Sequence, residues 1–331
     1  MEAPEDPGAR AAVLYSPDGR RTSLDELVAA ASEVDVVFVG ERHGDVSAHR
    51  LQLALLEALL EEGTHPDRQI ILSLEMFETD VQLVVDEYLA GFISEDHFLA
   101  AVRPWPNYRR DYRPLVELAA HTGIRVVAAN APRRYVNRVA RLGREALDDL
   151  PEGSAALLPP LPYVGPSEAY RSEWNQRMHA LAEGHGQAPV DAARNQGAHG
   201  HGGEATMHEH AGREDPALQA QALWDAAMAY SIHRALDCSR SDRSGEEGRS
   251  GSSCPETRAP PLVVHLTGSF HVENRTGTPE ALRHFRPNVR DLIVTVRAVE
   301  DPANFDEAFD GAGAGEVADF ILLTPLSSGH P

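Results

Sequence analysis

Four polar side chains of types that can bind metals or move protons stand directly after short apolar segments of the chain. They are Glu41, His43, Glu75 and His271. Two carboxylates and two imidazoles can bind Zn²⁺, Mn²⁺ or Fe²⁺ and still leave coordination positions open. The same groups can act without a metal, as general acid and base. Either use requires that the fold bring all four together.

The segments that precede these side chains are short, apolar and rich in β-branched residues, which predicts buried parallel strands. Strands are expected at 34–39, 70–74, 124–129, 262–266, 290–296 and 318–323. Between the first strands, leucines and valines at helical spacing predict amphipathic helices at 48–61, 81–89, 115–121 and 135–142. Strand alternating with helix favours an α/β fold, with an open, mainly parallel sheet flanked by helices.

An open parallel sheet binds its ligands beyond the carboxyl ends of the strands, so the residues after each strand decide the function. Gly40 permits a sharp exit from the first strand. Glu41 and His43 are two residues apart and face the same side in extended backbone. Glu75 closes an apolar strand, where a carboxylate needs a partner or a cation. We predict one shared site that includes His271; the alternative is that each residue separately caps a helix or bonds a loop.

Two stretches interrupt the alternation of strands and helices. Residues 151–215 are Pro-rich, then helical over 167–181, then Gly/His-rich; residues 239–259 are low-complexity and expected to be disordered. A long helix is predicted at 216–236 between them. We expect a single α/β domain over 1–331, in which the mostly helical insertion 151–215 lies over the carboxyl ends of the strands. Its core would comprise residues 34–150 and 216–325.

The composition excludes several classes of function. A formal charge of −21 argues against nucleic acid as a partner. All 30 basic residues are Arg, so no lysine-dependent P-loop or Schiff base is possible. No apolar stretch approaches the ~20 residues of a membrane span. The N-terminus shows no signal peptide, which leaves a cytoplasmic location open. Whether Cys238 and Cys254 form a disulfide is also open.

Two further segments could contact a ligand. The segment WPNYRRDYRP contains Trp105, Tyr108 and Tyr112, which either pack against helices or stack on a flat apolar ligand; a tyrosine oxygen can also ligate haem iron. Pro132 suits the first turn of a helix, where free N–H groups and Arg133 could hold a carboxylate or phosphate. Ordinary surface placement is the alternative for the arginine.

A His-rich tract lies in the insertion, with methionines nearby. Its histidines are His185, His199, His201, His208 and His210. Such tracts bind transition metals weakly, and a linker with incidental affinity is the simpler interpretation.

Read in chain order, the motifs resemble one known family. GERH with His49 and Gln52, LEMF with Gln82, NAPR, AQALWDAAMAYSI (220–232) and GSFH are similar to the ChaN-like haem-binding uptake proteins of the Tiki superfamily. The resemblance covers about residues 34–285. It implies an α/β sheet domain with a helical subdomain, often exported or lipid-anchored at the bacterial cell envelope, and a role in iron acquisition.

The resemblance also implies a ligand. Family members bind haem between two subunits through a tyrosine, so we expect haem or an iron complex as ligand and a homodimer around it. By position, Tyr112 is the implied axial ligand, with Tyr108 and Tyr135 as rivals. Arg133 would pair with a haem propionate.

Relatives in the wider superfamily imply a different activity. Erythromycin esterases and Tiki proteases use an equivalent Glu/His set for hydrolysis, generally with a metal in the proteases. The alternative hypothesis is therefore a metal-dependent esterase or peptidase using Glu41, His43, Glu75 and His271. A third is an envelope protein with a relic site and a structural role.

Overall fold

The computed structural model describes most of the chain. The described residues are 11–61, 68–182, 215–241, 260–309 and 313–326. Among them, seven strands form one sheet in the order β1-β7-β6-β2-β5-β3-β4. The strands are β1 Val13–Tyr15, β2 Val36–Glu41, β3 Ile70–Glu78, β4 Arg125–Asn130, β5 Leu262–Gly268, β6 Asp291–Val299 and β7 Phe320–Pro325.

The sheet is mainly parallel, as the sequence predicts. All strand pairs from β7 to β4 are parallel, and β1 pairs with β7 antiparallel at one edge. The α/β fold class is confirmed. The sequence did not reveal β1, because three residues are too few to show an apolar pattern.

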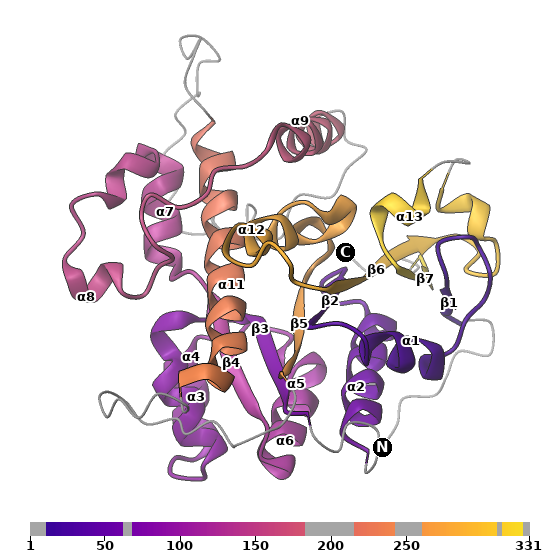
Figure 1. Cartoon of the computed structure of the whole chain (residues 1–331), viewed down its shortest axis with the longest axis horizontal. Coiled ribbons are helices and arrows are strands. Elements are labelled where there is room, and N and C mark those ends of the chain that lie inside the picture. The colour runs from indigo at the N-terminus through magenta and orange to yellow at the C-terminus, as the bar shows by residue number, and fades with distance from the viewer. Residues whose placement is uncertain (1–10, 62–67, 183–214, 242–259, 310–312, 327–331) are drawn as a thin grey trace.

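Helices cover both faces of the sheet (Figure 1). The α-helices are α1 Leu24–Ala31, α2 Val46–Leu60, α3 Gln82–Leu89, α4 Glu95–Val102, α5 Tyr108–Asp111, α6 Arg113–Thr122, α7 Arg133–Leu142, α8 Glu152–Ala155, α9 Glu168–Ala182, α11 Pro216–Ser241, α12 Thr278–Phe285 and α13 Ala314–Val317. The short 3₁₀ turns are η1 Thr79–Val81, η2 Arg144–Leu147, η3 Ser269–His271, η4 Glu273–Arg275 and η5 Phe305–Glu307.

The pleat of β2 divides the core into two layers. Phe38 belongs to the layer that contains α7, α11 and α12, whereas Val37 and Val39 belong to the layer that contains α2, α4 and α6. Successive side chains of a strand point to opposite faces, so a strand covered on both faces must be apolar throughout. This explains why β2 and its neighbours show no polar alternation.

Helix α2 begins directly after the Gly-Glu-Arg-His segment, two residues before its predicted start. Asp45 is its N-cap, and the carboxylate accepts from the backbone N–H groups of Ser47 and Ala48. This cap satisfies two of the free N–H groups of the first turn. It also fixes the chain direction between Glu41 and the helix, which carries His49 and Gln52 toward the sheet.

The described part of the insertion lies over the carboxyl end of β5. Tyr170 of α9 reaches α11, where its hydroxyl donates to Asp225. Arg177 of α9 stacks on Phe270, which follows β5, at 4.5 Å from the ring centre. Insertion and sheet end are therefore in direct contact.

Some predicted features lie outside the described residues. They include the His-rich tract, Cys254 and most of the low-complexity segment 239–259. Helix α11 continues to Ser241, so the helix extends past its predicted end at residue 236 and into that segment. No helix in the described ranges is both long and apolar enough to cross a membrane.

Candidate functional site

Three neighbouring strands bring the predicted residues to one edge of the sheet. Strand β5 lies between β2 and β3. Glu41, the last residue of β2, is in register with Gly268 at the end of β5. Glu75 follows Leu74, the last residue of β3 in regular register with β5, and a register shift begins there. His271 lies three residues beyond β5, in η3.

Glu41 is buried and bonded through both carboxylate oxygens. Its Oε1 lies 2.8 Å from His43 Nδ1 and also accepts from the hydroxyl of Tyr112. Its Oε2 accepts from Gln52 Nε2 at 2.5 Å. Burial raises the pKa of Glu41, but the bond and charge of His43, with the charge of His49, lower it more, so the pKa falls below its usual value.

His49 extends this cluster toward the aromatic segment. Its Nδ1 lies 2.9 Å from Gln52 Oε1, and its Nε2 lies 3.4 Å from Asp111 Oδ2. The His49 ring meets Tyr112 edge-on at 5.0 Å between centres. Segment 105–112 therefore packs directly against the Glu41 cluster.

Glu75 is equally buried but differently bonded. Its Oε2 accepts from the Thr267 hydroxyl at 2.6 Å and from the Gly268 N–H at 2.7 Å. Its Oε1 has no hydrogen-bond partner in the described part of the chain and lies 3.8 Å from His271 Nε2. Burial raises the pKa of Glu75, yet the charges of His271 and His43 outweigh it and lower the pKa to about 2.

His271 is held from behind by a second carboxylate. Its Nδ1 lies 2.8 Å from Asp225 Oδ1 on α11. Asp225 also accepts from the hydroxyls of Tyr170 and Thr278, at 2.5 and 2.9 Å. The site therefore contains two imidazole–carboxylate pairs, His43 with Glu41 and His271 with Asp225. The charges of both imidazoles lower the pKa of Glu75.

Gly268 marks the close approach of the two imidazoles. A Cβ at this position would lie 3.1 Å from His43 Nε2 and 3.6 Å from His271 Cδ2. Any side chain here would therefore press on His43. Thus the structure brings together all four residues singled out by the sequence, Glu41, His43, Glu75 and His271.

The geometry does not favour a metal centre. No group of three or more His, Cys, Asp or Glu side chains in the described part of the chain is arranged to hold a metal ion. Glu41 uses both oxygens on protein donors. These side chains are better suited to proton transfer. The Nδ1 of each imidazole contacts a carboxylate, and the charges of both imidazoles lower the pKa of the buried Glu75.

A cavity of about 400 Å³ opens beside Glu75, at the ends of β3 and β4. Its wall consists of Glu75, Met76, Glu78, Arg103, Trp105, Asn130, Ala131, Arg133, Arg134, Asn137 and Trp224. The cavity thus has two indole rings, three arginines and the buried carboxylate.

The three arginines of this cavity differ in their pairing. Arg103 bonds Glu78 and Asp80, and Arg134 bonds Asp80. Arg133, at the first position of α7, has no carboxylate partner among the described residues. It is therefore the cation of this wall that is available to an anionic ligand.

The three predicted tyrosines lie in different environments. Tyr112 donates to Glu41 and is 2% exposed, so its oxygen is not accessible to iron in this conformation. Tyr108 is equally buried, with a hydroxyl that has no partner. Tyr135 lies on α7; burial raises its pKa, but bonds from Ser154 and Arg134 lower it below the usual value. At 8% exposed, Tyr135 is the most accessible of the three.

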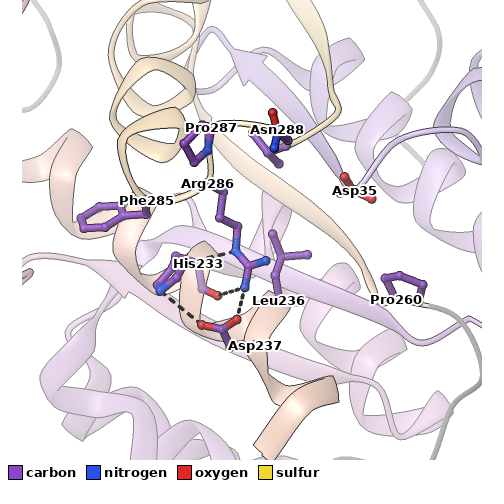
Figure 2. A pocket seen from close by; sticks show the side chains of 10 residues that line it. Asp35, His233, Leu236, Asp237, Pro260, Phe285, Arg286, Pro287 and Asn288 are labelled. Atoms are coloured by element: carbon purple, nitrogen blue, oxygen red, sulfur yellow. Dashed lines mark hydrogen bonds and ion pairs between the residues drawn. The ribbon is translucent and has the colours of Figure 1, made fainter.

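A second cavity, of about 450 Å³, lies at the amino ends of the strands, since Asp35 comes just before β2 and Pro260 just before β5. Figure 2 shows the side chains that line it. Arg286 there bonds His233 Nδ1 at 3.1 Å and also Asp237. Asp35 bonds Arg290 at 2.7 Å. The charges of these side chains neutralise one another, so the cavity shows no preference for an anionic or a cationic ligand.

Three residues of the site were not predicted from the sequence: Asp225, Tyr170 and Thr267. Asp225 lies within the motif AQALWDAAMAYSI, and an acidic residue on the apolar side of a helix was the signal that could have revealed it. Tyr170 has no such signal, because its contact with Asp225 joins helices 55 residues apart in sequence.

Comparisons with known proteins give one matching family model, one similar fold and one short sequence match. The family model described as "Haem-binding uptake, Tiki superfamily, ChaN" matches residues 27–282. A solved structure of ChaN from Campylobacter jejuni, titled for cofacial heme binding, superposes with a TM-score of 0.60 at 13% identity; the match covers 95% of this chain and 97% of that one. The chloroplastic protein RETICULATA-RELATED 5 of Arabidopsis thaliana is 26% identical over 100 residues, which is 30% of this chain and 14% of that protein.

Proposed function

Since the chain belongs to the haem-binding uptake family of the Tiki superfamily, we propose that it binds haem in the cavity beside Glu75. The single observation that carries this choice of site is Arg133. It is a cation without a carboxylate partner among the described residues, on a wall that also contains Trp105 and Trp224. Arginine forks pair well with carboxylates, and a haem has two propionates.

The ring and the iron need their own partners. The indole faces of Trp105 and Trp224 suit a flat macrocycle, of which the cavity would enclose one edge. Tyr135 is the proposed iron ligand, because it lies two residues after Arg133 on α7 and is the most exposed of the three predicted tyrosines. Tyr135 does not line the cavity itself, but it lies on the same helix as Arg133, which does. Bound haem would supply redox-active iron to this surface.

Haem titration followed by Soret absorbance tests this proposal. Wild-type protein should show a shifted Soret band, and Arg133→Ala should weaken haem binding by about tenfold, or about 1.4 kcal/mol. Arg141→Ala, at the other end of α7, is the matched control and should bind as wild type. A wild-type protein without a Soret shift would overturn the proposal.

Ligation is tested separately. Tyr135→Phe should alter the Soret position and the visible bands, whereas Tyr112→Phe should leave both unchanged, because its hydroxyl is buried on Glu41. The opposite result would restore Tyr112 as the ligand.

Sedimentation with and without haem would test the expected homodimer around the ligand. A role in iron acquisition at the cell envelope is part of the proposal and predicts poorer growth of a deletion strain on haem iron.

A second function is favoured by one observation, the two imidazole–carboxylate pairs beside the unpartnered Oε1 of Glu75. This arrangement suits hydrolysis of an ester or amide by acid–base catalysis. Glu75 would orient a water molecule whose proton passes to His43 Nε2. The hydroxide would attack the carbonyl carbon, and the leaving group would take the proton back from His43.

An ester panel with a chromogenic leaving group measures this activity directly. Glu75→Gln keeps the volume of the side chain and should abolish turnover. Ser73→Ala, two residues earlier on β3 and bonded to His265, is the control and should retain it. Absence of turnover in wild type, or full activity of Glu75→Gln, would exclude hydrolysis by this site without bearing on haem binding.

A further inference from the structure

Asp225 is a buried carboxylate that neither proposed function requires as a contact with the ligand. It is 2% exposed and lies on α11. Its Oδ1 accepts from Thr278 and lies 2.8 Å from His271 Nδ1, and its Oδ2 accepts from Tyr170. The Gly277 backbone also approaches it closely, since a Cβ on Gly277 would lie 3.0 Å from Oδ1. A carboxylate so enclosed has one orientation.

That orientation decides the proton position on His271. A carboxylate at 2.8 Å from Nδ1 accepts the ring proton there, so Nε2 carries the lone pair whenever the ring is neutral. Nε2 is also the nitrogen that lies 3.8 Å from Glu75 Oε1. Gln221 is the other polar neighbour: its Nε2 lies 3.2 Å from His271 Nε2 and 3.3 Å from Nδ1. Because this amide is almost equally close to both ring nitrogens, the Asp225 carboxylate is the group that selects the tautomer.

We propose that Asp225 is a positioning residue that holds His271 as the Nδ1-protonated tautomer, and that Tyr170 of the helical insertion holds Asp225 in place. Asp225 touches no substrate in this scheme and acts through His271. That His271 belongs to a hydrolytic site rests on the second proposed function. The tautomer itself does not, since it is a property of the protein without substrate.

The insertion thereby becomes part of the site. Tyr170 is fully buried with its ring against Phe270, 5.4 Å between centres, and Phe270 directly precedes His271. Trp174, one helical turn later in α9, lies 6.1 Å from the same ring. Helix α9 therefore contacts both the carboxylate behind His271 and the turn that carries it. A displacement of α9 would release both restraints together.

Nitrogen NMR of ¹⁵N-histidine-labelled full-length protein tests the proposal. His271→Gln assigns the signals, and the pH is kept where imidazoles are neutral. Wild type should show a protonated Nδ1 and an unprotonated Nε2 on His271. Asp225→Ala should move the signals toward the Nε2-protonated form, and Tyr170→Phe should move them in the same direction by a smaller amount.

Tyr163→Phe is the matched control. Tyr163 belongs to the same insertion and donates to α11, to the Gln219 carbonyl at 2.8 Å, but it does not reach Asp225. Tyr163→Phe should also remove one buried hydrogen bond, at a somewhat smaller cost in stability because its acceptor is neutral, while leaving the His271 signals unchanged. An Nε2-protonated His271 in wild type overturns the proposal even if Asp225→Ala fails to fold. A Tyr170→Phe spectrum identical to that of wild type overturns the role proposed for the insertion.

Discussion

Glu41 and Glu75 are two buried carboxylates at the ends of strands that flank β5, and their surroundings give them different capacities. Glu41 accepts hydrogen bonds at both oxygens, from His43, Tyr112 and Gln52. Glu75 concentrates its two donors on Oε2 and leaves Oε1 without one. Glu75 also lines the cavity, whereas Glu41 does not.

The difference separates positioning from reaction. A carboxylate whose two oxygens both accept from protein donors orients its neighbours and offers no unpartnered oxygen to a ligand. A carboxylate with a desolvated, unpartnered oxygen has an unmet bonding capacity that a water or a ligand group can satisfy. We therefore expect Glu41 to hold the framework of the site and Glu75 to be its reactive group.

The largest expected effect is that of Glu41→Gln on stability. The new amide NH₂ must face at least one of the donors that now bond Glu41, so a buried clash of donors results. We expect a loss of about 3–5 kcal/mol, the usual cost of breaking a buried charged pair. Urea unfolding at neutral pH measures it. A loss below that of Glu75→Gln would refute the distinction between the two carboxylates.

Glu75→Gln should cost less, about 2 kcal/mol, because the amide oxygen can replace Oε2 and its NH₂ can occupy the position of the unpartnered oxygen. The cost should depend on pH. The pKa of Glu75 is lowered from 4.5 to about 2, so its ionised form stabilises the fold above pH 4.5. That contribution is lost as the pH falls toward 2.

Unfolding curves of wild type and Glu75→Gln between pH 7 and pH 2 therefore should converge. The difference in unfolding free energy is expected to be full above about pH 4.5 and to shrink below it. A difference that stays constant over this range would show that the carboxylate of Glu75 is not held ionised by His271 and His43.

Tyr112→Phe should cost about 1.5 kcal/mol, since it removes one hydrogen bond to the charged Glu41 and leaves the ring packed. His49→Gln would be unsuitable as a control, because it would also remove the ring that packs on Tyr112. Tyr88→Phe, which removes a less buried bond to Glu117, is the control and should cost less. Equal costs would indicate that the Tyr112 bond is exposed to water.

The smallest expected effect is that of Gly268→Ala, about 1 kcal/mol. Its Cβ would lie 3.1 Å from His43 Nε2, so the imidazole must move by a few tenths of an ångström. Stability should change little, but the activity that depends on His43 and Glu75 should fall. Gly153→Ala, where a Cβ meets nothing within 4 Å, is the control.

The apolar pattern of the strands predicted most of the fold. Six of the seven strands lie close to their predicted positions, and their parallel direction follows from the helices between them. Strand β1 was missed because its three residues gain their stability from pairing with β7 rather than from a local pattern. The first helix after Gly-Glu-Arg-His was placed two residues late because its start depends on the Asp45 cap.

Within the site, the sequence alone determined where Glu41, His43, Glu75 and His271 lie, because parallel strands deliver the residues at their carboxyl ends to one edge of the sheet. Only the tertiary structure decided what each can do. The donors that occupy Glu41 come from α2 and from residue 112, and the carboxylate behind His271 comes from α11. Protonation and bonding depend on neighbours that are distant in sequence, and no local pattern encodes them.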